Sequence, residues 1–256
     1  MSTVAIIQAR MSSTRLPGKV LAEIAGEPML ALVSRRVRSA KTLDQVVIAT
    51  STSSADDAVE AVCRERGIAV FRGSEEDVLD RYRGAAEFAD AATVVRVTAD
   101  CPLIDPQVID LVVDEFRKGG ADYVSNTIQR TYPDGLDTEV MSRAALERAW
   151  SEAVLQSERE HVTPYIWKHP ELFPQRQVVQ AADLSALRWT VDEPRDLELV
   201  REVCRRLPAD RASMQDILVL LAEEPSLREL NAGIVMNEGY LRSLMEDRVI
   251  GRREEA

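Results

Sequence analysis

The stretch IIQARMSSTRLPGKVL, residues 6–21, joins the end of an apolar run to a basic loop. The run, VAII, is typical of a buried parallel strand, and the loop after it carries Arg10, Arg15 and Lys19. The first 22 residues contain no carboxylate, although the chain has 43 Asp and Glu against 32 Lys and Arg and a formal net charge of −11. Because open α/β sheets bind ligands at the carboxyl ends of their strands, this stretch predicts an α/β sheet with an anion site after its first strand.

Outward from this stretch, apolar strand-like runs alternate with amphipathic helical segments. The alternation predicts a mostly parallel central sheet that is covered by helices on both faces. The expected strands are residues 4–7, 45–50, 68–71, 93–98 and 122–126, and the expected helices run from about 28, from 53 or 54 to 66, from the capping spacing at 74–77 to about 89, and from 106 to 118.

After residue 126 the regular alternation of strand and helix segments ends. Residues 127–141 contain Pro133 and Gly135 and are expected to form a loop or hairpin. With no internal repeat and no clear linker, we expect residues 1–256 to form one domain, with a lid or dimerisation subregion at about 127–180 and a helical extension at about 208–256. Further elements are expected as helices near 143–153, 159–168 and 194–207, strands near 176–180 and 187–191, and a mostly helical tail from 213.

Composition excludes several classes of protein. A pI near 4.9 argues against a protein that coats nucleic acid or an anionic membrane. Cys63, Cys101 and Cys204 are few and widely spaced, so neither a disulfide framework nor a zinc site is indicated. The first apolar run is too short for a signal peptide, and no apolar stretch is long enough to span a membrane. We therefore expect a soluble cytoplasmic protein without nucleic-acid or membrane partners.

The basic loop matches neither common nucleotide motif. The P-loop pattern requires glycine five residues before Gly18, where this chain has Ser13, and Ser or Thr after the lysine, where it has Val20. A GxGxxG fingerprint is absent as well. If the loop binds phosphate, it must therefore do so with side chains as well as backbone.

The three cations suit that task in different ways. Arg10 and Arg15 can grip phosphate oxygens bidentately, whereas Lys19 supplies a compact point charge. Lys19 is one of only four lysines in the chain, which favours a specific need for an ammonium group. The alternative is a solvated basic turn with Pro17-Gly18 at its corner.

Seven segments resemble one enzyme family, the cytidylyltransferases that make CMP-activated sugar acids, such as the CMP-Kdo and CMP-sialic acid synthetases. The resemblance spans nearly the whole chain and is strongest to the spore coat polysaccharide protein F branch. It implies a Rossmann-like, GT-A-like nucleotidyltransferase fold, CTP as donor, a divalent metal such as Mg²⁺, and a homodimer. The segments are IIQARMSSTRLPGKVLAEIAGEPML (6–30), FRGSEEDVLDRY (71–82), RVTADCPLIDP (96–106), YPDGLDTEV (132–140), EREHVTPYI (158–166), RWTVDEPRDLELV (188–200) and NEGYLRSL (237–244).

The resemblance assigns nucleotide-binding residues. The triphosphate is expected on the first loop, with Arg10, Arg15 and Lys19 stabilising the diphosphate leaving group as its charge grows. Ser74 has the alternative role of a helix cap. The other nucleotide-binding residues implied by the resemblance are Gln8, Ala9, Ser12, Ser13, Arg72, Gly73, Ser74 and Thr98, of which 72–74 are expected to recognise the base.

The resemblance also assigns a metal site and an acceptor site. Asp100 and Asp192, each at the end of an expected strand, would hold one Mg²⁺ between them. The alternatives are an Asx-turn at Asp100 and a helix cap at Asp192. For His161 a purely structural role is the alternative. The acceptor-binding residues implied are Asn126, Asp134, Asp137, Glu139, Arg159 and His161.

The predicted reaction is attack by an acceptor hydroxyl on the α-phosphorus of CTP, with release of diphosphate. The partners are then CTP and a small-molecule acceptor, for which a sugar acid, an aminosugar derivative and a phosphonate are all open. Two other functions are alternatives: a GT-A-type glycosyltransferase that uses a nucleotide sugar, and a nucleotide-binding protein without catalysis.

Overall fold

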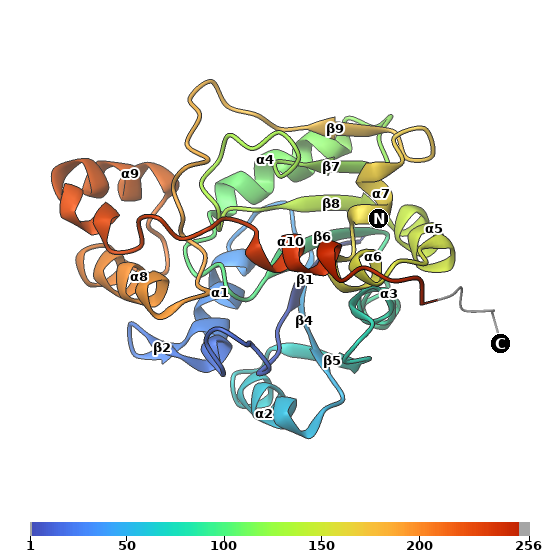
Figure 1. The fold of residues 1–256 in the computed structure, drawn as a ribbon, viewed down its shortest axis with the longest axis horizontal. Coiled ribbons are helices and arrows are strands. Elements are labelled where there is room, and N and C mark those ends of the chain that lie inside the picture. The colour runs from blue at the N-terminus through green and yellow to red at the C-terminus, as the bar shows by residue number, and fades with distance from the viewer. Residues whose placement is uncertain (1, 251–256) are drawn as a thin grey trace.

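The computed structural model describes residues 2–250 (Figure 1). Over these residues a seven-stranded sheet has the order β5-β4-β1-β6-β8-β7-β9, and β8 alone runs antiparallel to its neighbours. The expected mostly parallel α/β sheet is therefore confirmed. The strands are β1 (Thr3–Gln8), β4 (Gln45–Ser51), β5 (Ala69–Gly73), β6 (Thr93–Thr98), β7 (Tyr123–Ser125), β8 (Glu139–Ser142) and β9 (Gln175–Gln177), and a small hairpin pairs β2 (Glu23–Ile24) with β3 (Glu27–Pro28).

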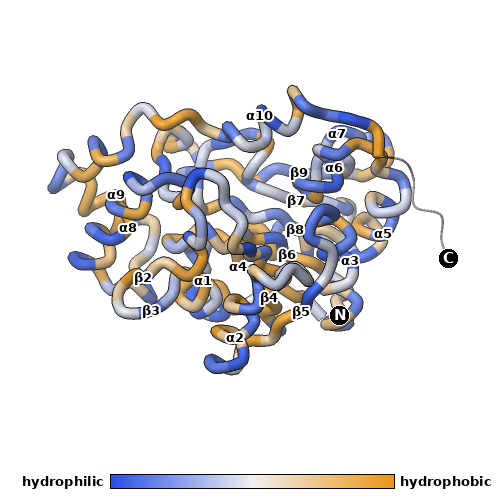
Figure 2. Tube along the Cα trace, turned by 60° about the horizontal axis from the view of Figure 1, so that its bottom comes forward, coloured by the Kyte–Doolittle hydropathy of each residue, from blue (hydrophilic) through white to orange (hydrophobic). Residues whose placement is uncertain are grey.

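Helices cover both faces of the sheet, as Figure 2 shows for β4 and β6 between α1 on one side and α3 on the other. One layer contains α1 (Met29–Arg38), α2 (Asp57–Glu65), α4 (Pro106–Arg117), α8 (Pro194–Arg206) and α9 (Met214–Glu223). The other contains α3 (Val78–Phe88), α5 (Arg143–Glu152), α6 (Gln156–His161) and α7 (Pro164–Lys168). The remaining elements are η1 (Lys19–Leu21), η2 (Ser54–Asp56), η3 (Pro225–Glu229) and α10 (Glu238–Met245).

The strand β1 shows why this sequence makes three layers. Its side chains alternate between the faces, so that Ala5 and Ile7 join one buried cluster while Val4 and Ile6 join the other. A strand that is buried on both faces has to be apolar along its length, which is what the VAII run provides. No helix in the described residues is long and apolar enough to cross a membrane.

The local structure differs from the expectations at four places. At 127–141 the expected loop or hairpin is present, since β8 pairs antiparallel with β7, but β8 also pairs with β6 and is buried on opposite faces at Val140 and Met141. The expected helix at 159–168 is broken into α6 and α7 at Val162, whose φ is +73°. The hairpin β2–β3 was not expected, and the expected strand at 187–191 forms only one isolated bridge.

The segment 187–191 is nevertheless held in place by backbone hydrogen bonds. Trp189 N and Thr190 N donate to Asp134 O at 2.6 and 3.1 Å, and Val191 N donates to Asp100 O at 2.8 Å. Gly135 makes this approach feasible, since its φ is +106° and a Cβ there would lie 2.7 Å from backbone atoms of residues 189 and 190. The glycine therefore fixes where the 187–191 segment runs.

We expect Gly135→Ala to destabilise the protein by more than the roughly 1–3 kcal/mol that backbone strain alone costs, because the new methyl group would also meet immovable backbone. Gly119→Ala is the matched control: its φ is also positive, at +75°, but its Cβ would meet no atom within 4 Å. Urea unfolding of both variants tests this. Equal losses of stability would show that the close approach at Gly135 is not limiting.

Candidate active site

The basic loop after β1 is anchored by a buried carboxylate. Asp56 accepts hydrogen bonds from Met11 N at 2.7 Å and from Ser51 N at 3.1 Å, so it ties the start of the loop to the end of β4. The loop turns back at Gly18, whose φ is +72° and whose N–H donates to Met11 O at 3.0 Å. These bonds place Lys19 at the start of η1, pointing inward and buried.

The Lys19 ammonium lies between the two predicted metal-binding carboxylates. Its Nζ donates to Asp100 Oδ2 at 2.7 Å, to Asp192 Oδ1 at 2.8 Å and to Val191 O at 2.8 Å. These bonds use all three donors of an ammonium, which explains why lysine rather than arginine stands here. The predicted meeting of Asp100 and Asp192 at one edge of the sheet is therefore observed, although Asp192 follows the 187–191 segment rather than a strand.

The electrostatics of this cluster are tightly balanced. Burial disfavours the charge on Lys19, but Asp100 and Asp192 outweigh it and raise the pKa of Lys19 above its usual value. Burial likewise opposes the Asp100 charge, yet Lys19 and the hydroxyl of Thr98 lower the pKa of Asp100 to about 2. The Asp100 carboxylate is thus held ionised beside this cation at neutral pH.

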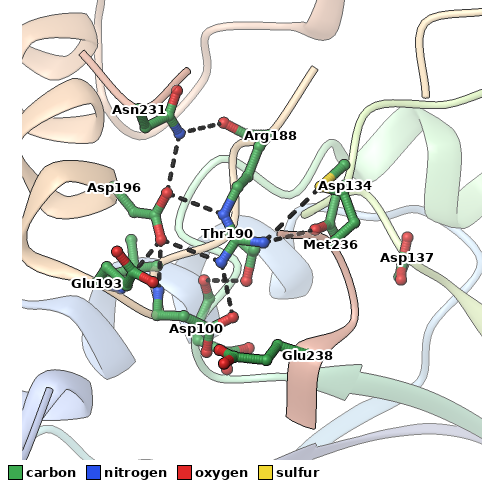
Figure 3. Close-up of polar contacts among 12 residues, drawn as sticks. Asp100, Asp134, Asp137, Arg188, Thr190, Glu193, Asp196, Asn231, Met236 and Glu238 are labelled. Carbon is green, nitrogen blue, oxygen red and sulfur yellow. Dashed lines mark hydrogen bonds and ion pairs between the residues drawn. The ribbon is translucent and has the colours of Figure 1, made fainter. Parts of the chain in front are cut away.

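Arg188 holds Asp192 from the other side, and Figure 3 shows its contacts with Asp134 and Asp196. Its guanidinium bonds Asp192 Oδ2 at 2.9 Å, Asp196 Oδ1 at 3.0 Å and Asp134 Oδ2 at 3.3 Å. The Asp196 carboxylate accepts from the N–H groups of Asp192 and Glu193, both at 3.0 Å, and so caps α8. The helix-cap alternative for Asp192 is therefore contradicted, because Asp196 does that work and leaves the Asp192 side chain facing Lys19 and Arg15.

Two adjoining cavities open on this cluster. The first, of about 460 Å³, lies over the basic loop and takes in Arg10, Ser13 and Lys19, and we call it the loop cavity. The second, of about 580 Å³, lies on the side of β8 and α7, and we call it the lid cavity. Both are lined by Gln8, Arg15, Thr98, Asp100, His161, Asp192 and Gly239.

The loop cavity is rich in cations. Arg10 is exposed and forms no ion pair with any residue between 2 and 250. Arg81, which the sequence analysis missed, is buried at 1% exposure. Its Nη1 donates to Ser74 O at 2.6 Å, while its Nε has no partner among the described atoms. Burial, with Arg10 adding to it, lowers the pKa of Arg81 below its usual value. Because the charged guanidinium is disfavoured in this surrounding, an anion bound in the cavity would stabilise it.

The other predicted nucleotide-binding residues do not all line the cavities. Ala9 also lines the loop cavity, whereas Ser12 is exposed and lines neither cavity. Arg72 is engaged by Asp57 and Glu60, each at 2.7 Å.

The stretch 72–74 lies outside both cavities. Gly73 packs so closely on Phe71 and Arg81 that a Cβ would clash at 2.9 and 3.1 Å. Ser74 Oγ accepts from Asp77 N at 3.0 Å, but the helix-cap alternative for Ser74 is contradicted, because the cap of α3 is Asp77, whose side chain accepts from Asp80 N at 2.9 Å. Since their polar groups are used within the fold, we leave Arg72, Gly73 and Ser74 out of the proposed site.

Four of the six predicted acceptor residues line the lid cavity, namely Asp134, Asp137, Glu139 and His161. Asn126 and Arg159 do not. Asn126 Nδ2 donates to Leu136 O at 2.9 Å, and the buried Arg159 guanidinium bonds Asp77 Oδ2 at 2.7 Å, so both side chains stabilise the fold. We therefore leave these two out of the site as well.

Three arginines that the sequence analysis did not single out neutralise the carboxylates of the lid cavity. Arg96 pairs with Glu139, Arg130 with Asp137 at 2.8 Å, and Arg188 with Asp134 at 3.3 Å. Burial and the neighbouring Asp137 nevertheless raise the pKa of Asp134 to about 7. The i,i+4 spacing of Arg188 and Asp192 was a local signal for one of these arginines, whereas the partners of Arg96 could not be read from the sequence.

The residues present fit a divalent metal. Asp100 and Asp192 each aim an oxygen at one point, where the Lys19 ammonium now lies, and carboxylate oxygens are ligands that Mg²⁺ prefers. No cluster of three or more His, Cys, Asp or Glu suited to a metal occurs in the described part of the chain. The remaining ligands would then come from substrate phosphate and water, which is how Mg²⁺ is usually bound in nucleotide sites.

The fold and this site are those of a Rossmann-like nucleotidyltransferase, with cations and paired carboxylates at the carboxyl edge of the sheet. The cytidylyltransferase family matches residues 4–240, and the chain belongs to that family. It is accordingly a CTP-dependent nucleotidyltransferase, which argues against both alternatives, the glycosyltransferase and the non-catalytic binding protein.

Three similar proteins support this placement. Spore coat polysaccharide biosynthesis protein SpsF of Bacillus subtilis is 35% identical over 229 residues, covering 86% of this chain and 94% of that protein. A 3-deoxy-manno-octulosonate cytidylyltransferase of Mesorhizobium japonicum is 41% identical over 126 residues, 48% of this chain and 51% of that one. A cytidylyltransferase structure from Leptospira borgpetersenii superposes with a TM-score of 0.87 at 33% identity, covering 92% of this chain and 99% of that one.

His161 lines both cavities without carrying charge at neutral pH. Burial, which outweighs the opposing effect of Glu160 and to which Arg96 and Arg10 add, lowers its pKa to about 4 from the usual 6.5, and its Nε2 lies 2.9 Å from Ser243 Oγ. An imidazole that resists protonation is suited to a neutral hydrogen bond rather than to an ionic phosphate contact.

This shift predicts a pH-dependent stability. Between pH 6.5 and 4 the unfolded chain binds a proton at His161 and the folded protein does not, so stability falls as the pH falls through this window. His161→Gln removes the effect. We therefore expect the free energy of unfolding of the variant minus that of the wild type, measured by urea unfolding, to be larger at pH 5 than at pH 8. A difference that is the same at both pH values would contradict the lowered pKa.

Proposed function

We propose that this protein is a metal-dependent cytidylyltransferase that transfers CMP from CTP to a hydroxyl group of a sugar acid and releases diphosphate. One observation supports this most directly: the loop cavity and the lid cavity meet over Asp100 and Asp192. A nucleotidyl transfer needs a nucleotide and an acceptor whose reacting atoms touch at one point, close to groups that manage phosphate charge.

The loop cavity suits the triphosphate. Arg10 and Arg81 face it with donors that the protein leaves unused, and Arg15 and Lys19 add two more cations. As the bond to the α-phosphorus breaks, negative charge accumulates on the diphosphate. Fixed cations stabilise that state more than the ground state because they need no reorganisation at the moment of reaction.

Asp100 and Asp192 would hold a Mg²⁺ ion. When bound, the ion would neutralise phosphate charge and polarise the α-phosphate, as divalent cations do in phosphoryl-type transfers. The chain's own contribution is to hold both carboxylates aimed at one point, through Thr98 on one side and Arg188 on the other.

The lid cavity suits a polyhydroxylated acceptor. The carboxylates of Asp134, Asp137 and Glu139 can accept hydrogen bonds from hydroxyl groups, while Arg130 and Arg188 can donate to a carboxylate of the substrate. The Mesorhizobium relative is named for a sugar acid, 3-deoxy-manno-octulosonate, which makes this class the first to test. A homodimer stays a prediction, for which light scattering in solution is the measurement.

We expect the purified protein to release diphosphate from CTP only when Mg²⁺ and an acceptor are both present, with CTP preferred over ATP and GTP. Lys19→Ala should lose on the order of 100-fold in kcat, as removal of one preorganised charge contact commonly does. Lys41→Ala is the matched control, since Lys41 is exposed and lies outside both cavities. A panel of sugar acids, aminosugar acids and phosphonates identifies the acceptor.

Two results would contradict the proposal. One is diphosphate release at equal rates from all nucleoside triphosphates, which would remove cytidine selectivity. The other is wild-type kcat in Lys19→Ala, which would mean that the ammonium between Asp100 and Asp192 takes no part in the chemistry.

A further inference from the structure

The helix α10 lies beside α6 (Figure 1). Its C-terminal end is fixed to the α5–α6 region, where Asp247 accepts from Ser157 Oγ at 2.7 Å and Ile250 N donates to Val154 O at 2.9 Å. The helix itself buries no residue. It is therefore held by polar contacts and by the edge-on contacts of Tyr240 with His161 and Trp167, at ring-centroid distances of 5.0 and 6.2 Å, rather than by a buried apolar face.

α10 contributes side chains to both cavities. Arg242, Ser243 and the neighbouring Glu246 line the loop cavity, whereas Glu238 and Tyr240 line the lid cavity. The sequence segment NEGYLRSL, which the triphosphate and metal assignments leave without a role, thus forms a wall of the site.

One carboxylate of α10 spans two cations. Glu238 Oε2 lies 2.8 Å from Arg15 Nη1, and its Oε1 lies 3.5 Å from Arg242 Nη2. Arg15 and Arg242 both line the loop cavity, one from the loop after β1 and the other from the tail. Glu238 therefore occupies the position between two guanidinium groups in which an anion with several oxygens would bind.

We propose that Arg15 and Arg242 together bind the terminal phosphates of the nucleotide, and that Glu238 occupies this site in the free protein. The inference rests on the proposed function for the identity of the nucleotide, but the chemistry is that of any triphosphate. Guanidinium groups bind phosphate oxygens bidentately and strongly, and a triphosphate carries more charge than one carboxylate.

Exchange of Glu238 for phosphate is feasible because its ion pairs are weakly held. The Glu238 side chain is 41% exposed and that of Arg242 50% exposed, and pairs this open to water contribute little to stability. A phosphate that bridges the loop and the tail would also tie α10 to the body of the protein. Arg242 thereby becomes a nucleotide-binding residue from outside the family match at residues 4–240.

Isothermal titration calorimetry with CTP, CMP and inorganic triphosphate tests the proposal. Arg242→Gln should weaken CTP and inorganic triphosphate about tenfold, as loss of a charged hydrogen bond does, and should leave CMP unchanged because CMP lacks the terminal phosphates. Arg211→Gln is the control for loss of a tail arginine, since Arg211 is exposed and lines neither cavity.

Glu238→Gln should strengthen binding of CTP and inorganic triphosphate several-fold by removing the competing carboxylate. Glu246→Gln removes the same charge from the same part of the tail, at a residue that lines the loop cavity, and Glu246 forms no ion pair with Arg15 or Arg242 within residues 2–250, so it should strengthen binding much less. The side chains of Glu238 and Glu246 both reach solvent on the tail. Circular dichroism and the melting temperature of each variant check that the fold is retained.

The outcomes separate the two proposals. Unchanged inorganic triphosphate binding in Arg242→Gln, or equal gains in Glu238→Gln and Glu246→Gln, would overturn the assignment of Arg242 and Glu238. If the variants change the binding of inorganic triphosphate as predicted but the wild-type protein does not prefer CTP over other nucleoside triphosphates, the assignment of Arg242 and Glu238 stands and the proposed function is contradicted. A wild-type protein that binds neither CTP nor inorganic triphosphate would overturn both the proposed function and the assignment of Arg242 and Glu238.

Discussion

The contact on which the site depends is the buried ammonium of Lys19 between Asp100 and Asp192. It joins three segments that are far apart in the sequence: the loop after β1, the end of β6, and the segment 187–191 with its following helix α8. Buried charges are stable only when they are paired and fully hydrogen-bonded, so this cluster constrains where each segment can lie. Gly135, Thr98 and Arg188 then serve to keep the two carboxylates aimed at one point.

The same balance of charge explains how an acidic protein can carry a basic loop. Two of the three loop cations are neutralised by carboxylates from distant segments, Lys19 by Asp100 and Asp192 and Arg15 by Asp192 and Glu238. Arg10 and the buried Arg81 are left to face the loop cavity. In our account, binding of a nucleotide with its metal exchanges one set of ionic contacts for another rather than filling an empty cationic pocket, and the fold supplies the compensating charges before the ligand arrives.

The central strands could be predicted from the sequence because they follow from local pattern, whereas the convergence of Asp100 and Asp192 was predicted from two strand ends and is observed although 187–191 forms no strand of the sheet. Strands β1 and β4 contain continuous apolar runs, the apolar run of β6 is interrupted only by Arg96, and parallel strands bring their carboxyl ends to one edge. β8 has four residues and follows a segment with Pro133 and Gly135, so its periodicity was too short to detect. The partners of charged side chains could not be read at all: Arg72 and Arg159 pair within the fold, whereas Arg81, on the apolar face of α3 beside Val78 and Tyr82, reaches the site.

The most direct test of the account is the position of a metal ion in a crystal grown with CTP and Mn²⁺, located by anomalous scattering. Mn²⁺ takes the oxygen ligands that Mg²⁺ prefers and is visible at its absorption edge. We predict one ion within coordination distance of an oxygen of both Asp100 and Asp192 and of a phosphate oxygen, with the Lys19 ammonium moved from its present place between the carboxylates toward the phosphates. An ion bound elsewhere, with Lys19 still bonded to both carboxylates while CTP is present, would contradict the account.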